Sequence, residues 1–180
     1  MTVTELLRRL HRHRAWVNRN LLDAATALTG EQLRAAFPIG QGSVWKSLLH
    51  MYGAELAWFE ALRGSEDYVV PGDAPGRLPG NQLGGGGIAD LPDLRQKWEA
   101  LERRYTDYLA ELSPDAMEET VARYSLALQT RLCLRRSDVL LHVCTHAHYT
   151  AAQVVNMLRQ CGATTLPQTM LTAMALHAAT

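Results

Sequence analysis

Three histidines stand within seven positions of the segment DVLLHVCTHAHYTAAQV, residues 138–154. His142 and His146 are four residues apart, a spacing that stacks two side chains on one face of an α-helix. The next position of that row, 150, holds a threonine. His148 is turned by about 200° around the helix axis from His146, so it points away from the row. Because imidazole binds Zn, Ni, Cu and Fe, the row indicates a metal site, the remains of one, or a polar stripe in a packed helix.

A metal site inside a helical bundle also needs a ligand from a facing helix. His50 is the only candidate, and it lies close to the apolar side of a second predicted helix. That helix starts after Ser43, a favourable N-cap, and runs to Gly64, a favourable C′ residue. The spacing of the histidines is weak evidence by itself, because a lone histidine on a helix is more often a hydrogen-bonded or surface residue.

The first helix is predicted from Thr2, because Thr2 and Glu5 have the spacing of a capping box. Thr29 and Gln32 repeat this spacing and open a short helical turn. The core face of the first helix is predicted from its apolar period; its members are Val3, Leu7, Leu10, Val17, Leu21, Ala24 and Leu28. Arg14 occupies one step of this row. We favour a side chain that extends to solvent along its alkyl stem over one that points into an internal cavity.

The rest of the chain contains two further long helices and a small extended segment. A third helix is predicted over residues 92–112, and alternating apolar residues over 120–134 favour a short β-hairpin or an extended crossover. Ser137 is expected to cap the histidine-bearing helix, which runs to about Cys161, and a final helix is expected with Pro167 in its first turn. Residues 71–91 are rich in glycine and proline and predict a long flexible connection. The pattern indicates an all-α four-helix bundle, with residues 1–180 forming a single domain.

Composition limits the classes of partner. The 180 residues include 18 basic and 18 acidic side chains, and the N-terminal arginines are spread around their helix, so nucleic-acid binding is not expected. No segment approaches the roughly 20 apolar residues that span a bilayer, and no signal peptide is recognisable. Cys133, Cys144 and Cys161 are odd in number and have no C-x-x-C spacing. We therefore expect reduced, mostly buried thiols in a cytoplasmic protein.

Three stretches together resemble the DinB/YfiT superfamily of damage-inducible, DinB-like proteins over nearly the whole chain. They are HRAWVNRNLLDAATALTGEQL, GSVWKSLLHMYGAELAWFEALRG and SDVLLHVCTHAHYTAAQVVNMLRQCG. The resemblance implies a four-helix bundle, commonly a homodimer, that holds a divalent metal with three histidines. Two of these positions are matched by His50 and His146. The third falls on Thr150, and of the family's HRGQ motif only Gln153 is kept.

A threonine hydroxyl is a poor ligand for a transition metal compared with imidazole. If structural zinc sites gain roughly 10–16 kcal/mol over four ligands, the loss of one costs roughly 3 kcal/mol. His142 could replace the missing ligand only if the ion moved about one helical turn toward the N-terminus of its helix. The predicted metal ligands are therefore His50, His146 and His142, with zinc or nickel as the ion, in a site weakened by Thr150.

Two functions remain open. Some relatives transfer or isomerise substrates with low-molecular-weight thiols, so the resemblance implies a metal-dependent thiol S-transferase or isomerase, with Arg14 or the glycine-rich loop near an acidic substrate. The alternative is a non-catalytic, binding or stress-associated bundle protein with a vacant metal pocket. A metallohydrolase is disfavoured because H-E-x-x-H is absent and the histidine-bearing helix has no acidic residue after Asp138. No G-x-S-x-G motif supports a nucleophilic serine.

Overall fold

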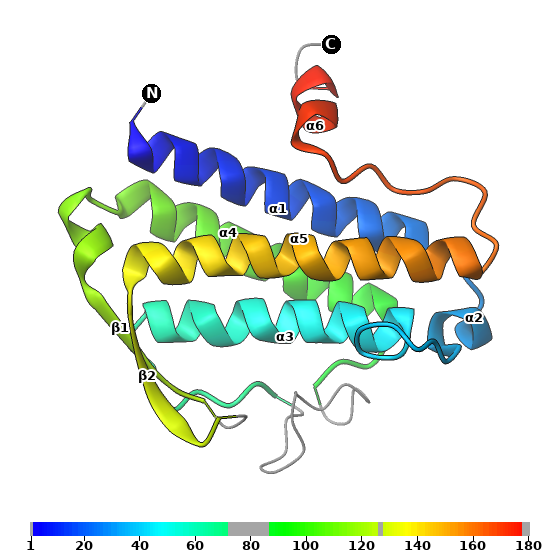
Figure 1. The fold of residues 1–180 in the computed structure, drawn as a ribbon, viewed down its shortest axis with the longest axis horizontal. Helices are drawn as coiled ribbons and strands as arrows, with labels where there is room; N and C mark the ends of the chain where they lie inside the picture. Colours follow the sequence, from blue (N-terminus) through cyan, green and yellow to red (C-terminus); the bar gives the residue numbers. More distant parts are fainter. Residues whose placement is uncertain (1, 72–86, 126–127, 178–180) are drawn as a thin grey trace.

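The computed structural model describes residues 2–71, 87–125 and 128–177, and these form a four-helix bundle with a small two-stranded sheet (Figure 1). The bundle predicted from the sequence is confirmed. The four main helices are α1 (Val3–Ala25), α3 (Val44–Leu62), α4 (Leu91–Glu111) and α5 (Arg136–Gln160). The smaller elements are α2 (Gly30–Arg34), a 3-10 helix η1 (Asp115–Glu118), β1 (Thr120–Ser125), β2 (Thr130–Arg135) and α6 (Leu171–His177).

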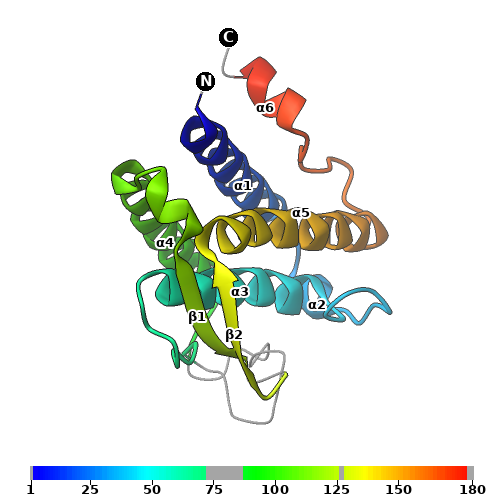
Figure 2. The same cartoon turned by 60° about the vertical axis from the view of Figure 1, so that its left-hand side comes forward.

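Of the two alternatives predicted for residues 120–134, the structure contains the β-hairpin. Strands β1 and β2 pair antiparallel from Thr120 opposite Arg135 to Ser125 opposite Thr130. Figure 2 shows the hairpin beside the end of α3 and leading directly into α5. Since α3 and α5 run in opposite directions along the bundle (Figure 1), a residue early in α3 lies opposite a residue late in α5.

Most helix ends follow the predicted capping chemistry. Both capping boxes form, at Thr2 and at Thr29, and Ser43 accepts a hydrogen bond from the backbone N–H of Lys46. Gly64 takes the positive φ of 93° that ends α3. These polar groups satisfy backbone N–H donors that a helix start leaves without partners.

The predicted start of α5 at Ser137 is wrong. The N-cap is Arg135, the last residue of β2, and it makes no side-chain capping bond. The backbone N–H of Arg136 instead donates to the carbonyl of Glu119 at 2.8 Å. The strand ladder therefore supplies the partner that a capping side chain would otherwise provide.

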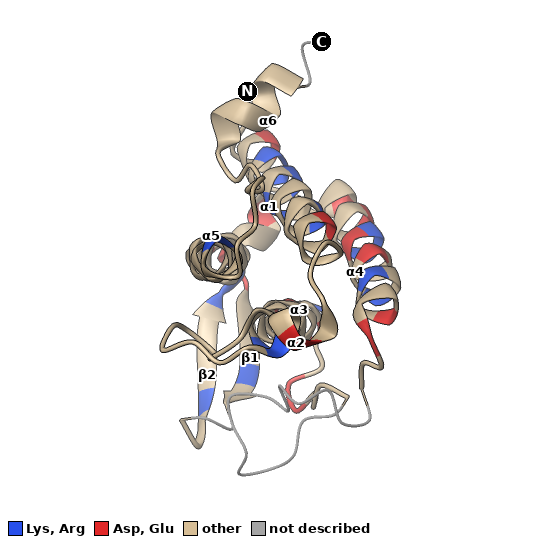
Figure 3. Cartoon of the chain, turned by 90° about the vertical axis from the view of Figure 1, so that its right-hand side faces the viewer, with Lys and Arg blue, Asp and Glu red and all other residues tan. Residues whose placement is uncertain are grey.

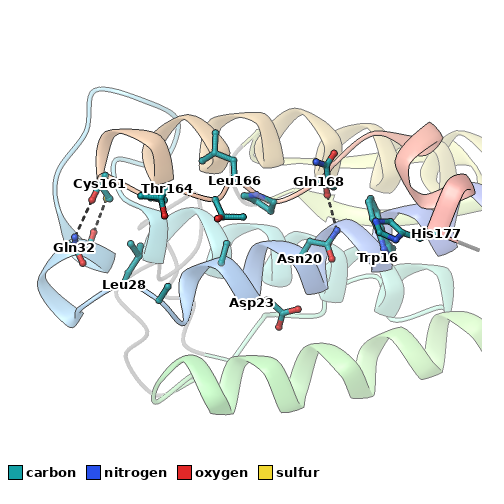
Figure 4. Close-up of a pocket in the computed structure, with 16 residues that line it drawn as sticks. Trp16, Asn20, Asp23, Leu28, Gln32, Cys161, Thr164, Leu166, Gln168 and His177 are labelled. Carbon is teal, nitrogen blue, oxygen red and sulfur yellow. Dashed lines mark hydrogen bonds between the residues drawn. The ribbon is translucent and has the colours of Figure 1, made fainter. Parts of the chain in front are cut away.

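The predicted final helix is present, but the place of Pro167 in its first turn is wrong, because α6 begins at Leu171 and Pro167 lies in the connection before it. Residues 161–168 form a strap that returns along α1 (Figure 4). Asn20 donates to the carbonyl of Gln168 at 2.9 Å, and Gln32 donates to that of Cys161 at 3.1 Å. A groove of about 840 Å³ lies between the strap and α1. None of its lining residues belongs to the histidine row of α5.

Arg14 corrects the sequence interpretation most clearly, because its side chain turns inward and is buried. It forms ion pairs with Glu55 of α3 and, at 2.6 Å, with Glu102 of α4. Trp98 donates to the same Glu55 oxygen at 2.9 Å, and Asn18 donates to the other at 3.0 Å. Burial raises the pKa of the Glu55 carboxyl, and Arg14 opposes that shift. A buried charge without partners is unstable, and the two carboxylates provide those partners to Arg14 at the wall of a cavity of about 1080 Å³ between α1 and α4.

Two further expectations need correction. Val3, placed in the core row of α1, is exposed, whereas His13 and Asn18 of that helix are buried. Of the three free thiols, Cys144 is buried, Cys161 is partly exposed and Cys133 is exposed. Cys133 lies on β2, which is largely exposed, so the apolar neighbours in its sequence do not enclose it.

Charged side chains gather on α1 and α4, as the end view in Figure 3 shows, while α3 and α5 carry few. The two helices that bear the predicted ligands are thus the more apolar pair.

No helix among the described residues combines the length and apolar character needed to cross a bilayer. The glycine- and proline-rich connection predicted over 71–91 lies mostly outside the described residues, and α4 begins at its last position.

Replacement of Arg14 by alanine is expected to destabilise the fold by about 3 kcal/mol, because it leaves the buried Glu55 carboxylate without its cation. The free energy of unfolding in urea measures this loss. The exposed Arg12 on the same helix provides the control, and Arg12→Ala should change stability by no more than about 0.5 kcal/mol. Equal stability of the two variants would contradict the role assigned to Arg14.

Candidate metal centre

His50 of α3 and His146 of α5 meet between the two helices. Their Nε2 atoms are 3.0 Å apart, and one of the two rings donates this hydrogen bond to the other. The ring centroids are 4.9 Å apart and the ring planes are inclined by 63°. Both side chains are partly buried. The structure therefore brings together the two histidines that the sequence proposed as ligands from facing helices.

The electrostatics of this pair favour neutral imidazole rings. Burial lowers the pKa of His50. Burial, then the neighbouring His50 and His142, lower the pKa of His146 to about 4. A neutral imidazole has a free lone pair, which is the form that binds a metal ion. Both rings are therefore already neutral at neutral pH, and a metal ion would not have to compete with an imidazolium proton.

The distance between the two nitrogens also fits a shared ion. Two imidazole ligands at about 2.0–2.1 Å from one ion lie roughly 2.9–3.4 Å apart, depending on the angle between them. The Nε2–Nε2 distance of 3.0 Å falls inside that range. The pair thus supplies two ligands of the right type at the right separation.

The structure does not bring His142 into this pair. Its ring is exposed and packs edge-on against Trp58, with 5.4 Å between the centroids, and its centroid is 5.8 Å from that of His146. Thr150 is buried one turn beyond His146. Within the described part of the chain, no three histidine, cysteine, aspartate or glutamate side chains gather closely enough to hold a metal ion.

The remaining residues singled out in the sequence lie elsewhere. His148 points away from the pair, as predicted, and its ring centroid is 6.4 Å from that of His13 on α1. Cys144 is buried, and burial raises the pKa of its thiol to about 12. Arg14 is held by two carboxylates on the far side of α3. Residues 72–86 of the glycine-rich connection lie outside the described residues.

Sequence reasoning missed Arg123, which β1 places beside the histidine row. Its guanidinium lies over the Trp58 ring, 4.8 Å from the centroid. The pKa of His142 is lowered mainly by burial and, as the second cause, by the positive charge of Arg123. A cation on a hairpin has no sequence signal that links it to a distant helix, so only the fold could reveal this neighbour.

Gln153, the one residue kept from the HRGQ motif, has a structural explanation. It packs against the turn that leads into α3, where Gly40 has a φ of 51°. A Cβ atom on Gly40 would lie only 2.1 Å from the Gln153 Oε1 atom. Contact between Gln153 and this turn therefore fixes the start of the helix that carries His50 against α5.

The chain was compared with known proteins. The model of the DinB family matches residues 1–178. A comparison with curated proteins found no match. Among solved structures the fold resembles YfiT from Bacillus subtilis, described as a probable metal-dependent hydrolase with an unusual four-helix bundle topology. The TM-score is 0.64 and the identity 18%, with 90% of this chain and 91% of that chain covered. At this identity the similarity shows the shared fold alone.

The neutral state of His146 gives a direct prediction. Its lowered pKa means that the folded state favours the neutral ring, so this contribution to stability is present above pH 6.5 and is lost as the pH falls toward 4. In an NMR titration of the imidazole nitrogens, His146 should titrate near pH 4. His50→Ala should raise the pKa of His146, because it removes a neighbouring ring and admits water. His148→Ala is the control and should leave that pKa unchanged; a shift of the same size in both variants would contradict the coupling.

Proposed function

The chain belongs to the DinB family, and from the histidine pair inside its bundle we propose that it binds a divalent transition metal between α3 and α5. His50 and His146 are the proposed ligands. The single observation that carries this proposal is the 3.0 Å distance between their Nε2 atoms. YfiT, whose fold this chain shares, is described as a probable metal-dependent hydrolase, which agrees with a divalent metal.

We assign zinc or nickel as the ion, since imidazole suits both. With only two imidazole ligands, the affinity should be modest. His142 is the nearest further histidine, but its ring would have to leave Trp58 to reach the ion. The proposed centre therefore keeps open positions, as catalytic metal sites do, rather than the closed set of a structural site.

We further propose a thiol-dependent transfer or isomerisation as the reaction. A bound divalent metal lowers the pKa of a thiol, so that the nucleophilic thiolate is present at neutral pH. The protein's own thiols do not fit this role, because Cys144 is buried with a raised pKa, Cys133 lies on the hairpin surface and Cys161 follows the far end of α5, against Gln32. The family resemblance implies a low-molecular-weight thiol that enters from solvent.

Arg123 takes the place that the sequence analysis gave to Arg14. It lies over Trp58, the ring that His142 contacts edge-on, so a positive charge stands next to the histidine row. An acidic group on a substrate would be attracted to this charge. Arg14, by contrast, is only 3% exposed, and its charge is already paired with Glu55 and Glu102.

Thr150 favours a second candidate function, a bundle protein that binds small molecules without metal chemistry. Its buried side chain occupies the position where the family resemblance implies a third histidine. Both candidates share the fold and the histidine pair. They differ in whether two imidazoles and the groups around them hold an ion.

Metal binding to matched variants separates the two candidates. Isothermal titration with zinc or nickel should show binding to the wild type and none to His50→Ala, because one of its two imidazoles is gone. Thr150→His should raise the affinity on the order of a hundredfold, the effect of a regained ligand worth roughly 3 kcal/mol. His148→Ala points away from the pair and should bind like the wild type.

One outcome would count against metal binding, and a second would count against a third ligand at position 150. If the wild type and His50→Ala both remain free of metal after incubation and elemental analysis, the non-catalytic candidate holds. If Thr150→His folds normally yet gains no affinity, the space around the pair does not admit a third imidazole.

A further inference from the structure

The Ser47 hydroxyl on α3 is buried without a hydrogen-bond partner. Its residue has an exposed fraction of 0%, and its Oγ atom makes no hydrogen bond. A serine inside a helix normally donates to the carbonyl three or four residues earlier. An unpaired buried hydroxyl lowers stability, and alanine would fill the same helix position without that cost. The group therefore calls for an explanation other than packing.

Ser47 lies one turn before His50 on α3. It precedes His50 by three residues, so the two side chains project from α3 about 60° apart. Helix α5 runs antiparallel to α3 (Figure 1), and His50 faces His146. The turn before His50 therefore lies opposite the turn after His146, which carries Thr150, exposed by only 2%. Two buried hydroxyls thus adjoin the same end of the imidazole pair.

We propose that Ser47 is part of the metal centre and that, with Thr150, it holds an oxygen ligand of the ion, which is water in the resting protein. This rests on the proposed function, since it assumes that His50 and His146 bind the ion. A water molecule can donate its two protons to two hydroxyl oxygens and keep a lone pair for the metal. The centre then has two nitrogen ligands from the chain and one oxygen ligand positioned by hydroxyl groups.

This assignment explains two features that a third imidazole would not. It gives a role to the unpaired Ser47 oxygen, whereas His142 lies one turn before His146, away from Thr150, and packs against Trp58. It also gives a role to a buried threonine at the position where a histidine would otherwise bind the ion directly. A mixed set of nitrogen and oxygen ligands is compatible with the zinc or nickel assigned to the proposed centre.

Cobalt(II) is a suitable probe, because its visible absorption reports the number and type of ligands. Ser47→Ala should lower the affinity for cobalt about tenfold, as expected when a group that orients a ligand is lost, and should alter the visible spectrum. Without metal, the same variant should unfold at an unchanged or higher urea concentration, since it removes an unpaired buried hydroxyl. The control is Ser137→Ala, at the other end of α5, which should keep the affinity and spectrum of the wild type.

The other possible results each overturn either this inference alone or the proposed function as well. Ser47→Ala with the affinity and spectrum of the wild type overturns this inference and leaves the proposed metal site intact. Loss of affinity in His142→Ala alone assigns the third position to that histidine and also overturns it. A parallel loss of stability and affinity in Ser47→Ala reduces the residue to a packing role. A wild type that binds no cobalt overturns the proposed function and this inference together.

Discussion

The buried carboxylate of Glu55 is the constraint on which the arrangement of the bundle depends. It stands in the middle of α3, is exposed by only 1%, and receives hydrogen bonds from Arg14 and Asn18 of α1 and from Trp98 of α4. An unpaired carboxylate in this position would cost several kcal/mol. Only one rotation of α3 about its axis presents Glu55 to all three donors, so the cluster fixes that rotation.

The same rotation determines where His50 points. Residues five positions apart on a helix differ by about 140° in direction, so a helix that presents Glu55 to α1 and α4 presents His50 toward α5. The position of α5 is fixed separately, because the His11 ring on α1 donates through Nε2 to the carbonyl of Leu140 at 3.1 Å. Burial and Arg14 lower the pKa of His11 to about 3, so its ring is neutral and keeps one N–H for this bond. The histidine pair therefore results from polar contacts made elsewhere in the core.

The sequence was sufficient for features that depend on local chemistry. Capping boxes at Thr2 and Thr29, the glycine that ends α3 and the alternation in the hairpin each involve residues a few positions apart, and the structure contains all of them. Features that depend on distant partners were not predictable. Arg14 looked like an exposed side chain because its two carboxylates lie on other helices. Ser137 looked like a cap because the sequence does not show that β2 runs directly into α5.

The residues of the candidate site were likewise predictable only where local spacing or the family resemblance indicated them. The spacing of His142 and His146 indicated a shared helical face, the need for a ligand from a facing helix pointed to His50, and the family resemblance matched His50 and His146. Spacing could not show that the His142 ring would pack on Trp58, since that contact joins α5 to α3. The spacing of residues also could not distinguish Ser47 from other small residues in the core of a helix. A hydroxyl can be recognised as unpaired only when the atoms around it are known.

An ion held by two imidazoles leaves part of its ligand set to groups from outside the chain, and this couples the metal to the substrate. If a substrate thiolate takes an open position, it binds more tightly when the metal is present, and by thermodynamic linkage the metal binds more tightly when the thiol is present by the same factor. A third histidine would raise the affinity for metal even when no thiol is bound. A smaller share of the metal-binding free energy would then depend on the thiol. In the proposed centre, threonine at position 150 would therefore change the balance between metal and substrate. A centre with two histidines is compatible with the proposed catalysis, because a bound substrate would supply part of the binding free energy.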